Sequence, residues 1–181
     1  MASGYVASPN GLELFLYSSA QPFTHGGDLA NKTWGRNTGI RLNRLRRDGF
    51  VSLDAPYAFS SSLSAFPAFT TVPVSFAPSL VATCTGMATG AGAGGVGLAL
   101  NAVTSVAGFV AVEVRLAASG RPVVGMELQH SDPCKGNFQK AIISWFNGSV
   151  RALDALAGQK LLLHVAMADA SLFSMNFVCL T

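Results

Sequence analysis

The feature that most constrains the fold is a series of short apolar or alternating runs in the last part of the chain. The runs occupy residues 96–101, 109–116, 123–128, 141–145, 160–166 and 171–180. Clusters of Gly, Ser, Asn, Asp and Pro divide them at 105–108, 118–120, 131–133, 147–148 and 157–158. Short strands that recur about every 8 to 12 residues, each followed by a turn signal, are typical of antiparallel sandwiches and barrels. We therefore expect an all-β fold with an antiparallel β-sandwich of the jelly-roll or concanavalin-like type.

The first part of the chain predicts β-hairpins. Residues 12–17 alternate between apolar and other side chains and follow the turn signal at 9–11. Residues 39–45 alternate in the same way, and Asp48-Gly49 marks a second turn. Alternation between turn signals is the pattern of a strand with one exposed face.

The middle of the chain has two segments of biased composition, the first of which favours extended edge segments and linkers over helix. Residues 55–78 are rich in Ser, Pro and Phe, and residues 85–97 are dominated by Gly and Ala. Such compositions favour edge strands and loops. The chain thus divides into hairpins (1–54), a linker or insertion with edge strands (55–95) and a sandwich (96–181).

The composition indicates a surface that contacts something else. The chain is 50% hydrophobic and only 12% charged, which is poor in charge for a free-standing soluble protein. No apolar stretch approaches the roughly 18 to 20 residues of a membrane-spanning helix, and the start of the chain has no pattern of a cleaved secretion signal. The compartment stays open: the chain would be secreted if a longer parent carried a signal peptide.

The charged and sulfur-containing residues exclude several classes of site. Four arginines gather at 41–47 but no aromatic side chains are interleaved with them, so we expect no nucleic-acid partner. The three cysteines, Cys84, Cys134 and Cys179, are widely spaced, which predicts buried free thiols and no metal site.

A glycine motif at 90–95 matches GxGxxG, with Glu113 at roughly the distance of a ribose-binding acid. A dinucleotide loop must open a helix, whereas residues 96–101 have the pattern of a strand, so we expect no cofactor. His130 and His164 lie in or beside strand runs, which favours hydrogen-bonded structural histidines.

No pair of acids has a spacing that fixes a catalytic geometry, so the sequence predicts no catalytic residue. A mixed aromatic and polar group could instead bind a sugar ring by stacking and hydrogen bonds. Packing of this group against a neighbouring domain is an equal alternative. Its members are Tyr17, His25, Asp28, Trp34 and Arg36.

Two triplets, Asn31-Lys32-Thr33 and Asn147-Gly148-Ser149, match the acceptor pattern for N-glycosylation. Such triplets are frequent by chance and have a meaning only in a secreted chain.

Two stretches together resemble a known family. Residues 14–19 (LFLYSS), 39–42 (GIRL) and 46–53 (RRDGFVSL) resemble the last blade of five-bladed β-propeller glycosidase-like proteins of the invertase and arabinanase type. The second stretch is similar to the β-sandwich that follows such propellers, and its matching segments are 98–101, 108–114, 120–125, 144–145, 156–160 and 170–177.

The resemblance implies a C-terminal piece of a larger hydrolase-like protein. In the family the catalytic carboxylates are spread over early blades, and this chain matches only the end of one. We therefore expect a non-catalytic, carbohydrate-associated module, with carbohydrate and the missing blades as its partners. The alternatives are part of a glycoside hydrolase whose catalytic blades lie elsewhere, and a structural sandwich that braces a partner.

Overall fold

The computed structural model of the chain describes residues 4–20, 39–87 and 94–180. The chain divides into two compact units, Met1–Phe50 and Val51–Thr181. Residues 55–95, expected to be a linker or insertion with edge strands, belong to the second unit. Both units are built from antiparallel β-sheet, so the class of the fold is all-β.

The first unit is a three-stranded sheet of order β1-β2-β3. Its strands are β1 (Val6–Ala7), β2 (Glu13–Ala20) and β3 (Gly39–Arg46). Both alternating runs predicted from the sequence are strands. The predicted turn at Asp48 is also present, since Asp48 has a φ of 54° and Gly49 N–H donates to the Arg46 carbonyl at 3.0 Å.

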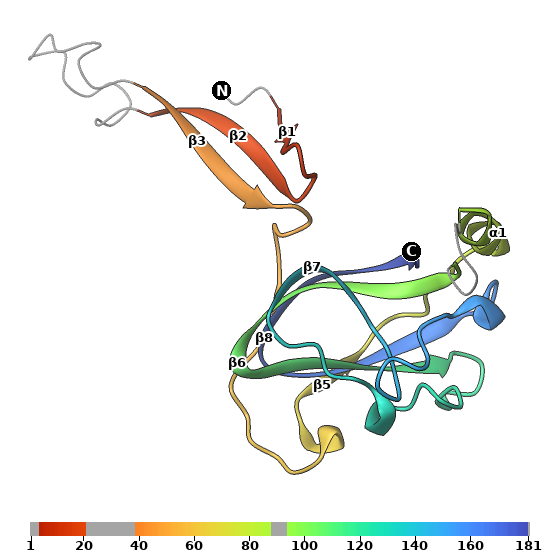
Figure 1. The fold of residues 1–181 in the computed structure, drawn as a ribbon. Helices are drawn as coiled ribbons and strands as arrows, with labels where there is room; N and C mark the ends of the chain where they lie inside the picture. Colours follow the sequence, from red (N-terminus) through yellow and green to blue (C-terminus); the bar gives the residue numbers. More distant parts are fainter. Residues whose placement is uncertain (1–3, 21–38, 88–93, 181) are drawn as a thin grey trace, which may run out of the picture. The chain divides into compact units, whose positions relative to one another are not determined.

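The second unit is a five-stranded sheet of order β4-β8-β6-β7, with β5 also paired to β8. Two long strands dominate it, and Figure 1 shows them running side by side and curling over together. The strands are β4 (Leu53–Ala55), β5 (Ala68–Thr70), β6 (Val96–Leu116), β7 (Asn137–Ile142) and β8 (Leu161–Cys179). The helical elements are α1 (Pro78–Gly86) and the short 3₁₀ turns η1 (Leu63–Ala65), η2 (Leu128–His130) and η3 (Asp154–Leu156).

The prediction of a chain reversal at 105–108 is wrong, because β6 continues through this segment. The pairing of β6 with β8 shifts register between Thr104 and Phe109, where four residues of β6 stand opposite Asp169 alone. The chain bends here, as strands do at a bulge. β8 is likewise continuous from 161 to 179, across the boundary that the sequence suggested between 166 and 171.

The strand predicted at 123–128 is absent. Val123 N–H donates to the Val114 carbonyl at 2.8 Å and Val114 N–H donates to the Met126 carbonyl at 3.1 Å, and the chain then enters η2. Residues 121–134 instead form hydrogen bonds with the edge of β6, along the part of β6 that β7 does not pair with. Val112 N–H, for example, donates to Ser131 Oγ at 3.0 Å.

The main core fills the inside of the curled sheet. It is formed by inward side chains of β6 and β8, including Leu100, Val112 and Val165, which are fully buried. Trp145 is 0% exposed, and its Nε1 donates to the Val112 carbonyl at 3.0 Å. The prediction that Trp145 points into the core is confirmed.

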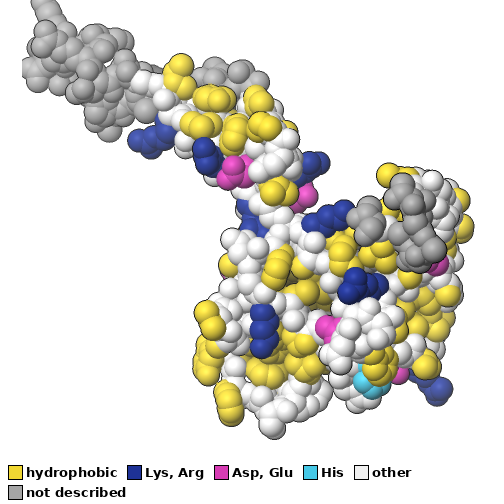
Figure 2. Space-filling view, in the orientation of Figure 1, with side chains coloured by type: hydrophobic (Ala, Val, Ile, Leu, Met, Phe, Trp, Pro, Cys, Tyr) yellow, Lys and Arg dark blue, Asp and Glu magenta, His cyan; other side chains and the backbone are white. Residues whose placement is uncertain are grey.

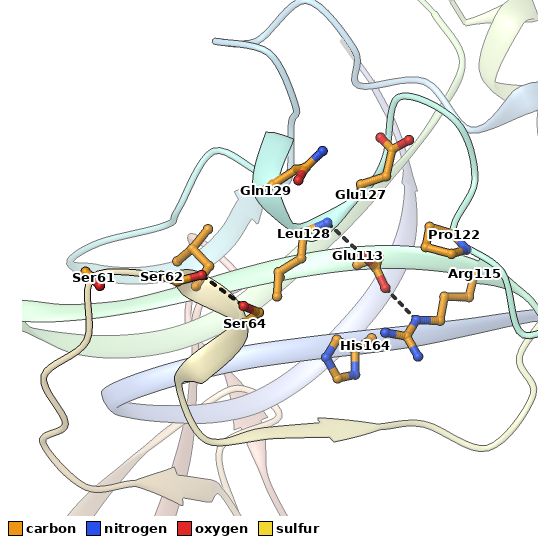
Figure 3. Close-up of a pocket in the computed structure, with 11 residues that line it drawn as sticks. Ser61, Ser62, Ser64, Glu113, Arg115, Pro122, Glu127, Leu128, Gln129 and His164 are labelled. Atoms are coloured by element: carbon orange, nitrogen blue, oxygen red, sulfur yellow. Dashed lines mark hydrogen bonds and ion pairs between the residues drawn. The ribbon is translucent and has the colours of Figure 1, made fainter.

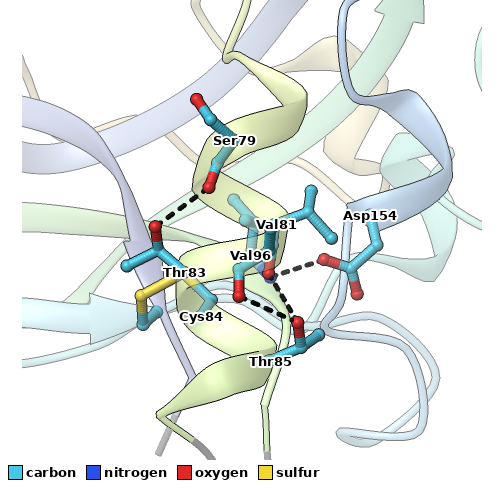
Figure 4. The surroundings of a disulfide bond; sticks show 9 residues. Ser79, Val81, Thr83, Cys84, Thr85, Val96 and Asp154 are labelled. Carbon is cyan, nitrogen blue, oxygen red and sulfur yellow. Dashed lines mark hydrogen bonds between the residues drawn. A yellow bond between two sulfur atoms is a disulfide. The ribbon is translucent and has the colours of Figure 1, made fainter.

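The prediction that all three cysteines are free is wrong. Cys84 on α1 and Cys179 at the end of β8 form a disulfide across 95 residues of sequence (Figure 4). Only Cys134 is a free thiol. Beside the disulfide, Asp154 Oδ1 accepts the backbone N–H of Val96 at 2.8 Å, which holds the start of β6.

Candidate functional site

A polar pocket lies on the face of the β6–β8 pair that points away from the main core. Along this part of β6, the side chains at Phe109, Ala111 and Glu113 share that face, because successive strand residues alternate between faces. The register sets Ala111 opposite Ala166 and Glu113 opposite His164. The phenylalanine and the alanines carry a small second apolar cluster, and the face turns polar at Glu113.

The walls of the pocket come from two loops over the sheet. Figure 3 shows Ser61, Ser62 and Ser64 on one side and the η2 segment with Gln129 on the other. The pocket has a volume of about 730 Å³, which falls within the range of roughly 300–1,000 Å³ that small-molecule sites occupy. Its lining residues are Ser61, Ser62, Leu63, Ser64, Glu113, Arg115, Pro122, Glu127, Leu128, Gln129 and His164.

Both carboxylate oxygens of Glu113 are engaged inside the protein. Oε1 accepts a hydrogen bond from Nε of Arg115, and Oε2 accepts the backbone N–H of Leu128 at 2.9 Å. The first contact orients the guanidinium of Arg115. The Arg115 side chain is 31% exposed, whereas the Glu113 side chain is only 8% exposed. Glu113 therefore fixes the η2 loop and Arg115, and the remaining guanidinium N–H groups are the donors that a ligand could meet.

His164 is held on the opposite strand. Its Nδ1 lies 2.9 Å from Oγ1 of Thr70, which stands opposite it on β5. Burial lowers the pKa of the His164 imidazole below its ordinary value, and the Arg115 cation lowers it further against the opposing effect of Glu113. The imidazole is thus mainly neutral at pH 7, and its other nitrogen, Nε2, donates or accepts according to the tautomer. The hydrogen bond that the sequence led us to expect for His164 is present.

Glu127 contributes the second carboxylate of the pocket. Its Oε2 lies 2.9 Å from Nδ1 of His130 and accepts the backbone N–H of Gly125 at 2.9 Å. The hydrogen bond from His130 is the main cause that lowers the pKa of Glu127. Glu127 is therefore ionised at neutral pH and suits hydrogen-bond acceptance better than acid catalysis.

The arrangement can bind a polar molecule through many hydrogen bonds. Hydroxyl, amide, guanidinium, imidazole and carboxylate groups line one space, so it offers both donors and acceptors. In the part of the chain that the structure describes, no group of three or more His, Cys, Asp or Glu side chains could hold a metal ion. No helix among the same residues is long and apolar enough to cross a membrane.

The site predicted from the sequence is only partly placed. Tyr17 lies on β2 and is 51% exposed, beside its cross-strand partner Leu42. His25, Asp28, Trp34 and Arg36 lie outside the described residues.

The pocket was not predicted from the sequence, which pointed to Glu113 and His164 only as separate residues and gave no role to Arg115. The available signal was the pattern Glu113-Val114-Arg115, in which two opposite charges share one face of a strand that is otherwise apolar.

Comparisons of the chain with protein-family models, with curated proteins and with solved structures give no match.

Proposed function

We propose that the chain is a non-catalytic, carbohydrate-associated module of a glycoside-hydrolase-like protein, and that it binds saccharide in the polar pocket of the second unit. The observation that carries this proposal is the pocket itself. It sets the Arg115 guanidinium, the neutral His164 imidazole and the Gln129 amide around one space of about 730 Å³. Sugar hydroxyl groups donate and accept at the same time, and this mixed lining matches them.

The state of the two carboxylates supports binding over hydrolysis. A glycosidase needs one carboxyl group that carries a proton and a second that is free to act as nucleophile or base. Both carboxylate oxygens of Glu113 accept hydrogen bonds, one from Arg115 and one from the backbone N–H of Leu128. The hydrogen bond from His130 lowers the pKa of Glu127. Neither is prepared for the acid role.

The proposal takes the detailed fold of each unit from the family resemblance. The second unit corresponds to a β-sandwich of the jelly-roll or concanavalin-like type, and the first unit to the end of a propeller blade. The curled sheet made by β6 and β8 is compatible with one half of such a sandwich. The aromatic group around Tyr17 remains a second predicted sugar-contacting surface.

A glycan array tests the proposed function. The purified chain is expected to bind a subset of neutral or uronate-containing oligosaccharides. Arg115→Ala and Gln129→Ala should each weaken binding, the first by about tenfold or more, since a hydrogen bond from a charged donor contributes about 1.5–3 kcal/mol. Gln129→Ala leaves the Glu113 contacts in place and so separates recognition from folding.

The matched control is Arg121→Ala, which removes an exposed arginine that does not line the pocket. Its binding should equal that of the parent. An array without any signal, or equal binding by all three variants, would refute the pocket as a saccharide site.

A second candidate function is supported by the first unit. Its three-stranded sheet carries exposed apolar side chains, with Ile40 82% exposed, Tyr17 51% and Leu42 41%. Figure 2 shows hydrophobic side chains at the surface of this part, with arginine side chains among them. Sheets of three strands normally bury a face to be stable, and a propeller blade buries both. This favours the alternative that the chain is part of a glycoside hydrolase whose other blades cover the sheet.

Hydrogen exchange on the intact chain tests this alternative. If a partner must supply the cover, the amides of residues 14–17 should exchange far faster than those of residues 110–114, which lie in the buried half of β6. Equal protection of the two segments would show that the sheet needs no further blades.

A further inference from the structure

The triplet Asn147-Gly148-Ser149 occupies a tight turn at the surface of the second unit. The turn is closed by two backbone hydrogen bonds between Trp145 and Val150, at 2.9 Å and 3.1 Å. Trp145 anchors it in the core, and the residues between project outward. The other triplet, at Asn31, lies outside the described residues.

The acceptor side chain of the turn is accessible. Asn147 and Ser149 are both exposed, and no described residue hydrogen-bonds the side-chain amide of Asn147. The backbone of the turn is held from below, because Asp132 accepts the N–H groups of Asn147 at 2.8 Å and Gly148 at 2.7 Å. Asn147 and Gly148 have φ of 53° and 82°, values that Asn and Gly tolerate better than other residues.

The disulfide is a second, independent observation. Cys84, which is buried, is joined to the half-buried Cys179, and structural disulfides form and persist in oxidising compartments. Asparagine-linked glycans are added to chains that enter the same secretory compartments. The disulfide therefore points to an oxidising secretory compartment, which is where the triplet at Asn147 would be glycosylated.

We propose that Asn147 is an N-glycosylation site. In the transfer, Nδ2 of Asn147 forms a bond to C1 of the first sugar of a lipid-linked oligosaccharide. The bond from C1 to the pyrophosphate oxygen of the donor breaks, the lipid pyrophosphate leaves with that electron pair, and Nδ2 loses one proton. No oxidant or reductant is needed. Ser149 supplies the hydroxyl that defines the triplet.

The site accounts for part of the unusual surface of the chain. A charge content of 12% leaves few groups to keep an exposed apolar surface in solution, and Phe146, next to Asn147, is 44% exposed. A bulky hydrophilic glycan at this turn would shield that surface.

The test is secretion of the full chain from cultured insect cells behind an added signal peptide, in an Asn31→Gln background. The secreted protein should lose the mass of one glycan on treatment with an amidase that releases N-linked glycans, and peptide mapping should place the modification on Asn147. Asn147→Gln and Ser149→Ala should each abolish the shift, while Ser149→Thr should retain it.

The two Ser149 variants distinguish loss of the glycosylation site from a change in folding. Both alter the same exposed side chain, but only Ser149→Ala removes the hydroxyl group. A secreted chain without glycan at Asn147, or a shift that survives Ser149→Ala, would overturn the proposal. Free thiols at Cys84 and Cys179 in the secreted protein, found by non-reducing peptide mapping, would remove its second support and also count against it.

Discussion

Gly108 and Asp169 approach so closely at the bend of the curled sheet that a Cβ on Gly108 would stand 2.2 Å from the Asp169 carbonyl oxygen. The Ala168 carbonyl oxygen would lie only 2.8 Å from the added Cβ. Both neighbours are backbone atoms, which cannot rotate away as a side chain can. The bend that joins the two halves of β6 thus depends on the absence of a side chain at this position.

Gly108→Ala should therefore lower the free energy of unfolding by about 2–3 kcal/mol, at the upper end of the usual cost of overpacking. The matched control is Gly86→Ala at the end of α1, where an added Cβ meets nothing within 4 Å. Urea denaturation of the two variants measures the difference. Equal stability of both variants would contradict the described bend.

Trp145→Ala should lower the free energy of unfolding by about 3–5 kcal/mol, the range for truncating a buried large aromatic side chain. Trp145 is fully buried, and the change also leaves the Val112 carbonyl without its side-chain donor. Phe146→Ala, at a neighbouring but exposed position, should cost much less. Thermal melting of both variants tests the contrast, and similar melting temperatures would place Trp145 at the surface.

Reduction of the Cys84–Cys179 bond should destabilise the second unit by about 2–5 kcal/mol, because the bond closes a loop of 95 residues and restricts the unfolded chain. Cys84→Ser should have the same effect without a reductant. Cys134→Ser, which changes the free thiol, provides the control. Denaturation curves that do not respond to reductant would contradict this account.

The thiol of Cys134 should react slowly with iodoacetamide near pH 8. Burial is the main cause that raises its pKa from an ordinary value near 9 to about 11, and Asp132 adds to the effect. The thiolate is the reactive form, so the alkylation rate of the native protein should keep rising up to about pH 11. In the unfolded protein the Cys134 thiol ionises near pH 9, whereas in the native protein it ionises only near pH 11, so ionisation favours unfolding. The free energy of unfolding should therefore fall as the pH rises from about 9 to 11. A rate plateau near pH 9 in the native protein would contradict the burial of Cys134.

Sequence patterns predicted the elements whose causes are local. Residues 109–116 and Trp145 were placed correctly because alternation and apolar runs act within a few residues. The bend at Gly108 was mistaken for a reversal, since the same turn signal serves both and only pairing with β8 decides. The disulfide was missed because two cysteines 95 residues apart carry no spacing signal. The pocket was missed for a similar reason: the register of β6 on β8 brings Glu113 opposite His164, and no sequence pattern states that register.

The most direct test of the proposed function is an NMR titration of the ¹⁵N-labelled chain with the neutral and uronate-containing oligosaccharides of the array. Saccharide binding in the pocket predicts saturable shifts of the amide signals of Glu113, Leu128 and His164, while the amides of residues 96–101, at the other end of β6, stay unchanged. Saturable shifts confined to the signals around Tyr17, or no saturable shift with any saccharide, would contradict the pocket as the binding site.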